Sequence, residues 1–167
     1  MATITFKGQP IRTVGRLPAI GANAPAFKLA GADLTDRTLD DFTGTRKILS
    51  IVPSLDTPVC AISAKRFSEE VSRLTGVVLL NISADLPFAQ KRFCDSQSLK
   101  NVVTLSTFRS PSFGRDYGVE IAEGPLAGLM SRAVLVLDAS NRVIWAEQVP
   151  EIAQEPDYGL VLAALKK

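Results

Sequence analysis

The chain contains two cysteines, Cys60 and Cys94, and no histidine. A cysteine acts as a nucleophile in its thiolate form, which a neighbouring imidazole often generates by accepting the proton. Because the chain has no imidazole, every mechanism that pairs cysteine with histidine is excluded. A reactive thiolate here must be stabilised by backbone dipoles, a hydroxyl group or an arginine.

Cys60 ends a segment that begins at Pro53 and reads Pro-Ser-Leu-Asp-Thr-Pro-Val-Cys. Residues 47–52 before it are largely apolar and rich in branched side chains, which predicts a buried strand that Pro53 ends. Thr57 suits the N-cap of a following helix, and the proline after it suits the first helical position. The sequence therefore predicts Cys60 in the first turn of a helix that directly follows a core strand.

The predicted place of Cys60 allows two interpretations. First-turn N–H groups lack helical partners and carry the positive end of the helix dipole, which stabilises a thiolate by up to about 2 kcal/mol. The alternative is a small buried hydrophobe, because Cys60, Ala64, Phe67, Val71 and Leu74 follow at helical spacing and share the core-facing side. The strand followed by a Thr-Pro-x-Cys helix start favours the reactive cysteine.

Cys94 does not form a C-x-x-C pair with Cys60. It is either a core cysteine beside Phe93 or a resolving thiol that forms a disulfide with Cys60 after oxidation. A disulfide requires Cα atoms within about 7 Å, so two separate helices would have to unwind locally to form it.

Arg132 stands at the start of an apolar strand predicted at residues 133–137. An arginine at a strand end is commonly a solvated charge, yet functional sites gather at the strand ends of α/β sheets. Arg132 is therefore the candidate cation for the Cys60 thiolate.

Composition bounds the remaining classes of function. The 167 residues are 46% hydrophobic and 22% charged, which fits one globular domain, residues 1–167. The net charge of +2 comes without a basic cluster, so nucleic acid is not an expected partner. No membrane-spanning run or signal peptide is visible, so we expect a cytoplasmic protein without a structural disulfide. Two cysteines without histidine also argue against a zinc site.

Hydrophobic periodicity predicts an N-terminal hairpin within residues 1–15 and then, from residue 47, strand, helix, strand, helix, strand, strand, strand and helix. Helical crossovers favour parallel strands, and the late hairpin favours an antiparallel edge. The predicted fold is α/β, with a central mixed sheet flanked by helices and an N-terminal β-hairpin. With a cysteine at the first strand–helix junction, it resembles a thioredoxin-like fold. The expected ranges after the hairpin are a short strand at 27–29, strands at 47–52, 77–82, 102–105, 133–137 and 143–147, and helices near 58–74, from 87 past 94, and at 156–166.

Taken together, these residues resemble the peroxiredoxin family, and within it the atypical two-cysteine thiol peroxidases of bacteria. Pro53, Thr57 and Cys60 fit the family motif Pro-x-x-x-Thr-x-x-Cys, and Arg132 fits its distant arginine. The segment from Ser83 to Cys94 and the N-terminal hairpin fit as well, so the resemblance covers essentially the whole chain.

The resemblance implies an antioxidant enzyme that reduces hydrogen peroxide and organic hydroperoxides. Cys60 would be the peroxidatic nucleophile and become a sulfenic acid, with which Cys94 condenses to an intramolecular disulfide. Thr57 and Arg132 would stabilise charge on the leaving oxygen, and Pro53 would shape and dry the pocket. Thioredoxin is the implied reductant, a homodimer is the implied assembly, and no metal, haem, flavin or other cofactor takes part.

Two other classes of function stay open. The same thiol chemistry could serve a peroxide sensor or redox-relay interaction protein, although an internal resolving Cys94 favours a self-contained enzyme. The chain could also be a thioredoxin-fold binding module with inert cysteines.

Overall fold

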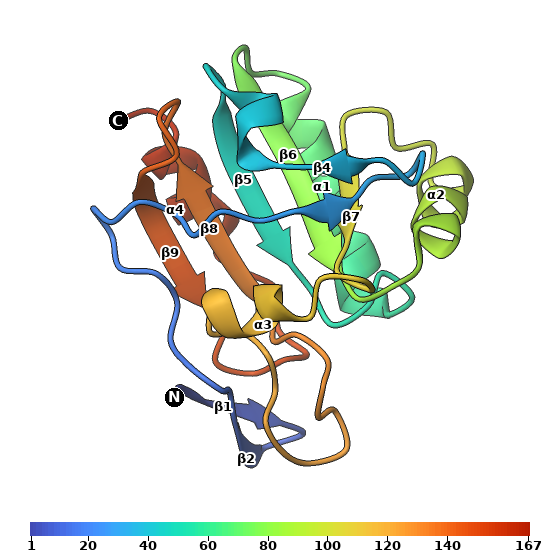
Figure 1. Cartoon of the computed structure of the whole chain (residues 1–167), viewed down its shortest axis with the longest axis vertical. Helices are drawn as coiled ribbons and strands as arrows, with labels where there is room; N and C mark the ends of the chain where they lie inside the picture. The colour runs from blue at the N-terminus through green and yellow to red at the C-terminus, as the bar shows by residue number, and fades with distance from the viewer.

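The computed structural model describes residues 1–167 and contains two β-sheets (Figure 1). Strands β1 (Thr3–Phe6) and β2 (Gln9–Arg12) form the small sheet, and the other seven strands form the large sheet in the order β4-β3-β7-β6-β5-β8-β9. The strands of the large sheet are β3 (Leu29–Ala30), β4 (Asp36–Arg37), β5 (Arg46–Ile51), β6 (Val77–Ser83), β7 (Val103–Ser106), β8 (Ala133–Leu137) and β9 (Val143–Gln148). The helices are the 3₁₀ helix η1 (Leu39–Phe42) and the α-helices α1 (Pro58–Val71), α2 (Pro87–Ser96), α3 (Ser112–Asp116) and α4 (Tyr158–Ala164).

The large sheet is mixed, which confirms the predicted α/β thioredoxin-like class. Strands β5, β6 and β7 run parallel, and their crossovers contain α1 and α2. Strand β8 runs antiparallel to β5 and to β9, as the late hairpin predicted. The sequence predicted one antiparallel edge, but there are two, because the short strand β3 pairs antiparallel with both β4 and β7.

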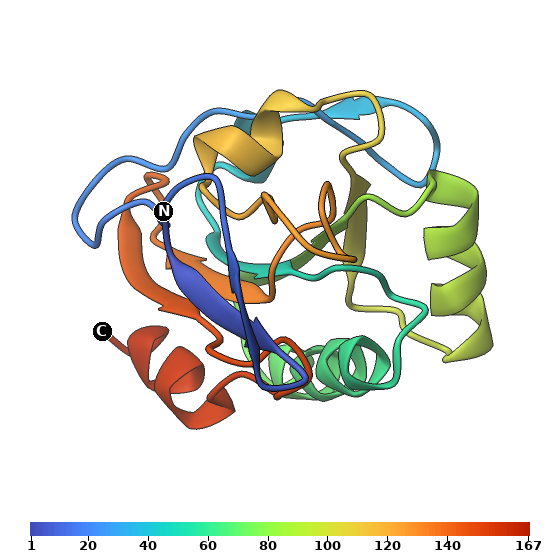
Figure 2. The ribbon, with the colours of Figure 1, turned by 90° about the horizontal axis from the view of Figure 1, so that it is seen from below.

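The sheet lies between two layers of helices and loops (Figure 2). Helices α1 and α4 pack on one face through Phe67, Val71, Tyr158 and Val161, while α3 and the segment around Phe27 cover the other. Helix α2 lies beside the β7 side of the sheet. None of the helices has the length and apolar composition needed to cross a bilayer.

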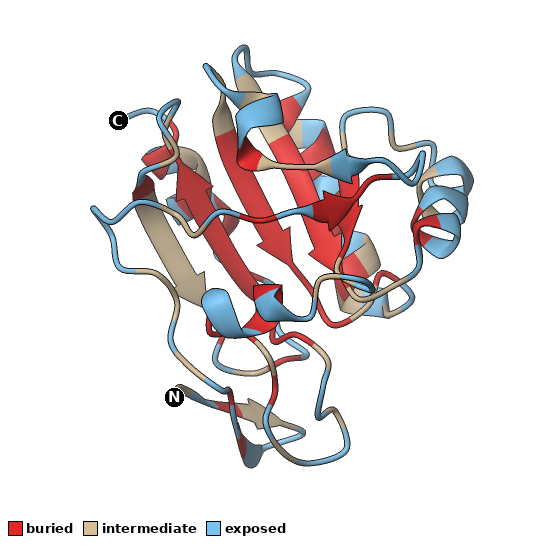
Figure 3. Ribbon diagram, in the orientation of Figure 1, coloured by how far each residue is buried: buried red, intermediate tan, exposed pale blue.

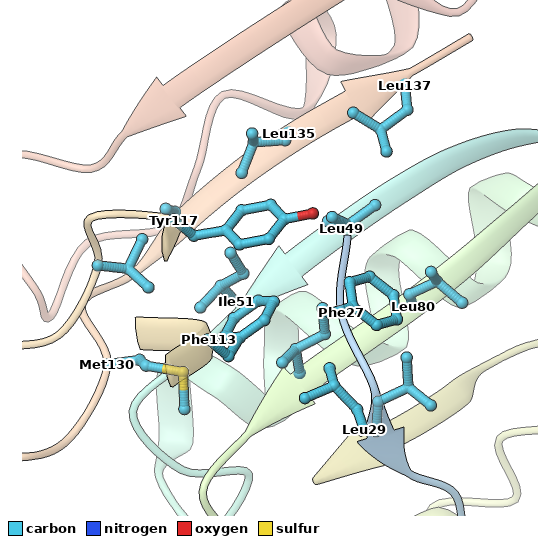
Figure 4. Packing of buried hydrophobic residues seen from close by; sticks show 14 of the residues in the cluster. Phe27, Leu29, Leu49, Ile51, Leu80, Phe113, Tyr117, Met130, Leu135 and Leu137 are labelled. Atoms are coloured by element: carbon cyan, nitrogen blue, oxygen red, sulfur yellow. The ribbon is translucent and has the colours of Figure 1, made fainter. Parts of the chain in front are cut away.

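The two faces of the sheet differ in chemistry because side chains alternate along each strand. The face under α3, here called the apolar face, carries leucine and isoleucine across the central strands (Figure 4). The face under α1, here called the cysteine face, is apolar where the parallel strands begin, at Ile48 and Leu79. Toward their carboxyl ends it carries buried polar residues, and the central strands are buried on both faces (Figure 3). The apolar face includes Leu49, Ile51, Leu80, Ile82, Leu105 and Leu135; the buried polar residues of the cysteine face are Ser50, Asn81, Ser83, Thr104 and Ser106.

The predicted N-terminal hairpin is confirmed, with its turn at Lys7 and Gly8. Lys7 and Gly8 both have positive φ angles, 51° and 76°, so a two-residue turn joins β1 and β2. The hairpin packs through Ile4 and Ile11 against Ile121 and Ile152.

Helix α1 is shorter than predicted, and its buried stripe differs at one end. It ends at Val71, and Leu74, which the helical spacing assigned to the stripe, lies beyond the helix and is partly exposed. Ser63 and Ser68 are buried on the helix instead. The Tyr158 hydroxyl lies 3.1 Å from the Ser63 hydroxyl and donates to Glu155 at 2.8 Å, so this side of α1 is joined by hydrogen bonds to the C-terminal segment.

Candidate active site

Cys60 occupies the position that the sequence predicted. It is the third residue of α1, directly after the loop that follows β5. Its side chain is fully buried in a small cluster with Val52, Leu55 and Ala64, against which Phe93 of α2 also packs. Both cysteines are free thiols. Cys60 therefore lies in an enclosed apolar site, here called the Cys60 recess, at the carboxyl ends of the parallel strands, where α/β folds place their functional groups.

Thr57 is the N-cap of α1 by position and backbone, with φ −128° and ψ 147°, but its side chain does not cap the helix. Its hydroxyl donates instead to the carbonyl oxygen of Ser54 at 3.1 Å, which closes a local turn. The expectation that Thr57 accepts a capping hydrogen bond is therefore wrong. The first-turn N–H groups of α1 remain available to an anionic or polar ligand.

Arg132 lies at the same end of the sheet as Cys60. Ile51 of β5 pairs with Ala133 of β8 in antiparallel register, so the next step places Arg132 opposite Val52, which packs against Cys60. Alternation along β8 puts Arg132 on the cysteine face with Val134. The structure therefore joins Arg132 and Cys60 through a shared neighbour.

The side chain of Arg132 is buried, with only 3% of its surface exposed. Its Nε donates to the carbonyl oxygen of Ile152 at 2.9 Å, whereas its Nη1 is buried without a hydrogen-bond partner. A buried guanidinium nitrogen without an acceptor is costly, and an anion beside it would satisfy it. Arg132 is therefore not the solvated strand-end charge that was the ordinary alternative.

Pro53 is buried between Val52 and Ser54, at the point where β5 has ended. Val52 still donates to the carbonyl oxygen of Ile82 at 3.0 Å, and Pro53, which has no N–H, cannot continue this pairing. It lies where the chain leaves the sheet, next to Val52, which packs on Cys60.

Cys94 lies on α2, apart from the Cys60 recess. It is half-buried and lines a separate pocket with Lys91, Asp95 and Thr104, while its neighbour Phe93 packs on the Cys60 cluster. Burial raises the pKa of the Cys94 thiol, and Asp95 raises it further against an opposing effect of Lys91. The structure thus brings Phe93, and not Cys94, to Cys60, as expected for two cysteines on separate helices.

Asp85 is a functional candidate to which the sequence analysis gave no role. It follows β6 and accepts three hydrogen bonds: from the Ser54 hydroxyl at Oδ1 (2.7 Å), and from the Leu55 N–H (2.8 Å) and Ser83 hydroxyl (2.7 Å) at Oδ2. Gln90 of α2 donates to the Ser83 hydroxyl at 3.1 Å. In the sequence, Ser-Ala-Asp follows the apolar run of the strand that neighbours β5. Adjacent parallel strands end on the same side of the sheet, so this motif indicated a position near the loop after β5.

No group of three or more cysteine, aspartate or glutamate side chains is arranged to hold a metal ion. Beside the Cys60 recess, a pocket of about 530 Å³ is lined by Ser54, Asp56, Asp85, Arg92 and Phe93, among others. Its charges of both signs suit a small polar molecule.

Comparisons with known proteins agree over the whole length of the chain. The family described as Redoxin matches residues 19–162. Thiol peroxidases of Mycobacterium tuberculosis and Mycobacterium bovis are each 53% identical over 165 residues, covering 99% of both chains. A peroxiredoxin-like protein from Aquifex aeolicus superimposes with a TM-score of 0.93 at 38% identity, covering 99% of this chain and 96% of that one. A thiol peroxidase from Chromobacterium violaceum gives 0.92 at 25% identity, covering 98% and 95%.

Proposed function

This chain belongs to the Redoxin family and is related along its full length to thiol peroxidases, and from that premise we propose that it reduces hydrogen peroxide and organic hydroperoxides through Cys60. The relationship itself supports a peroxidase that acts as an oxidoreductase. The observation that carries the assignment to Cys60 is the buried, unpartnered Nη1 of Arg132 on the same face and at the same end of the sheet. An inert core cysteine needs no such group.

The first step is attack of the Cys60 thiolate on the peroxide O–O bond. The sulfur bonds to one oxygen, the other leaves with the bonding electron pair and a proton as water or an alcohol, and Cys60 becomes a sulfenic acid. Arg132 and the first-turn N–H groups of α1 are suited to stabilise charge on the leaving oxygen. Because the Thr57 hydroxyl donates to Ser54, its proposed role is to accept from the peroxide O–H, and the role toward the leaving oxygen that the resemblance implied for it is left to Arg132 and the first turn. Pro53 keeps the recess dry.

The second step is condensation of the Cys94 thiol with the sulfenic acid, which forms the Cys60–Cys94 disulfide and releases water. Because Cys94 lines a different pocket, the first turn of α1 and the end of α2 must open locally before the sulfur atoms meet. Thioredoxin then reduces the disulfide by thiol–disulfide exchange. No cofactor takes part.

We further propose that residues 1–167 act as one domain with residues 1–15 as a hairpin extension, that the active form is a homodimer, and that the cycle runs in the cytoplasm. The hairpin packs on the rest of the chain through Ile121 and Ile152, which supports a single unit. The cytoplasm keeps thiols reduced, as the resting enzyme requires. A peroxide sensor that uses the same cysteines is the alternative function.

Two serine variants test the proposal. Cys60→Ser should abolish peroxide consumption, because the variant keeps the shape of the recess but has no thiol. Cys94→Ser should consume one equivalent of peroxide and stop at a sulfenic acid that overoxidises readily, with no turnover with thioredoxin. The measurements are peroxide consumption and the intact mass of each variant.

Either of two results would overturn the assignment of the cysteines. Peroxide consumption by Cys60→Ser above a few per cent of the wild-type rate would place the nucleophile elsewhere. Undiminished turnover of Cys94→Ser with thioredoxin would make Cys94 a core residue. Wild-type oxidation without thioredoxin-dependent turnover would instead support the sensor.

A further inference from the structure

The carboxylate of Asp85 holds the loop that leads to Cys60. Its two oxygens accept from the Ser54 hydroxyl, the Leu55 N–H and the Ser83 hydroxyl, each within 2.8 Å. The carbonyl oxygen of Asp85 accepts from the Ser106 hydroxyl at 2.5 Å. One residue therefore connects the loop after β5 to the ends of β6 and β7.

Ser54 connects Asp85 by hydrogen bonds to the start of the helix that carries Cys60. Its hydroxyl, which donates to Asp85, also accepts from the Asp56 N–H at 3.1 Å, and its carbonyl oxygen accepts from the Thr57 hydroxyl at 3.1 Å. Thr57 is the N-cap of the helix that carries Cys60. The backbone that sets the first turn of α1 is thus held by a short chain of hydrogen bonds that starts at Asp85.

Asp85 also stands at the start of the helix that carries Cys94. It comes two residues before Pro87, the first residue of α2, and its partner Ser83 accepts from Gln90 of α2. Gln90 is buried and also donates to the carbonyl oxygen of Leu105 at 3.0 Å. The same network therefore fixes the segments that precede both cysteine helices.

We propose that Asp85 is a positioning residue that holds the Cys60 loop in its peroxide-reactive conformation and acts as a shared latch between the two cysteine helices. While its hydrogen bonds hold, Thr57 and the first turn of α1 stay in place for attack on peroxide. When they break, the loop and the start of α2 are released together, which lets Cys94 reach Cys60. The link to the reaction rests on the proposed function.

The test is Asp85→Asn, which keeps the size of the side chain but accepts at only one of the two oxygens. Single-turnover mixing with hydrogen peroxide, acid quench and mass analysis separate Cys60 oxidation from disulfide formation. We expect the oxidation rate constant to fall about tenfold or more, the disulfide-forming rate constant to stay equal or rise, and amide exchange at residues 54–60 and 86–90 to quicken. Loss of structural stability alone would slow both steps.

Two further variants keep the test decisive. Ser54→Ala removes one link and should change both steps in the same directions, so the latch is testable even if Asp85→Asn folds poorly. Asp138→Asn is the matched control. Asp138 accepts from the Ser140 and Arg142 N–H groups at 2.9 Å in the β8–β9 turn, which lies at the end of the sheet where β5 begins. It should leave both rates unchanged.

Unchanged rates and exchange in Asp85→Asn and Ser54→Ala, or a parallel fall of both rates, would overturn the proposal. If the wild-type protein fails to consume peroxide, the proposed function fails. Amide exchange at residues 54–60 in the reduced variants then still decides whether Asp85 holds the loop.

Discussion

The two faces of the central sheet belong to the same strands but carry different kinds of side chain. On the apolar face, Leu80 and Ile82 of β6 pack in a continuous hydrocarbon cluster with Phe113 and Tyr117. On the cysteine face, Asn81 of the same strand is fully buried, and neither polar atom of its side chain has a hydrogen-bond partner. Buried unpartnered polar groups lower stability, so they persist where function requires them. The apolar face holds the fold together, and the cysteine face carries the residues of the proposed reaction.

The same contrast is visible in how the helices are attached. Phe113 and Tyr117, at the two ends of α3, both pack into the hydrocarbon cluster of the apolar face. The first turn of α1, by contrast, follows a loop that the Asp85 hydrogen bonds hold. Hydrogen bonds at a surface loop break and re-form more readily than a hydrophobic cluster exchanges partners. We therefore expect motion during catalysis on the cysteine face, where the parallel strands end.

The largest expected effect on stability is on the apolar face. Leu80→Ala should lower the free energy of unfolding by about 2–5 kcal/mol, because it leaves a cavity in a fully buried cluster. Asn81→Leu, at the next residue on the other face, should leave stability unchanged or raise it, because it replaces an unpartnered amide by an apolar group of similar size. Urea denaturation measures both. Equal losses in the two variants would contradict the distinction between the faces.

The fold was predictable because its signals are local. The runs at β5, β6 and β8 are largely apolar, and the proline at the first position of each long helix marks where it starts. The second antiparallel edge was not predictable, because β3 has only two residues and depends on pairing with β7 for its existence. Of the site, the motif predicted where Cys60 lies but not that the Thr57 hydroxyl turns back to Ser54. Asp85 could not be assigned, because its role depends on the packing of two loops that are distant in sequence.

The second expected effect concerns the charge on the cysteine face. Arg132→Met should slow oxidation of Cys60 by peroxide about 100-fold, or roughly 2.7 kcal/mol in activation free energy, because it removes the donor for the leaving oxygen. The rate should stay low at pH 9, where an ordinary cysteine is largely ionised. Stability should change little, because an unpartnered buried charge is lost together with one hydrogen bond. Stopped-flow oxidation and thermal melting measure the two quantities.

Arg142→Met is the matched control for Arg132. Arg142 is exposed and donates to the carbonyl oxygen of Gly21 at 2.9 Å, beside the β8–β9 turn. It should leave the oxidation rate unchanged. Full recovery of the Arg132→Met rate at high pH would mean that Arg132 only promotes ionisation of Cys60, and its role toward the leaving oxygen would be wrong.

The smallest expected effect is a pH dependence of the opening of α2, the helix that carries Cys94. Burial raises the pKa of Cys94, with Asp95 adding to the shift and Lys91 opposing it; Asp33 and Arg37 line the same pocket. The pKa of Cys94 is therefore higher in folded α2 than in an opened helix. The protonated thiol contributes its full stability to folded α2 below the pKa of an ordinary cysteine, and this contribution is lost as the pH rises through the raised pKa. Opening of α2 should therefore become easier as pH increases.

The rate of disulfide formation after oxidation by one equivalent of peroxide should accordingly rise with pH. It should keep rising beyond the pKa of an ordinary cysteine, about 8.5, and level off only at the raised pKa of folded Cys94, because loss of the thiol proton favours the opened helix. Quenched-flow sampling with thiol alkylation measures this profile. A rate that levels off near the ordinary cysteine pKa would mean that burial does not keep Cys94 protonated, and would contradict the link between its ionisation and the opening of α2.

The central claim, that the cysteine face performs a two-cysteine peroxidase reaction, is tested most directly by an anaerobic titration of the reduced protein with hydrogen peroxide and, separately, with an organic hydroperoxide. Intact mass and non-reducing peptide mapping follow the product. The account predicts that one equivalent of either peroxide removes two hydrogen atoms from the chain and links Cys60 to Cys94, and that thioredoxin restores both thiols. A protein that stays unmodified, or that gains oxygen at Cys60 without a bond to Cys94, would contradict it.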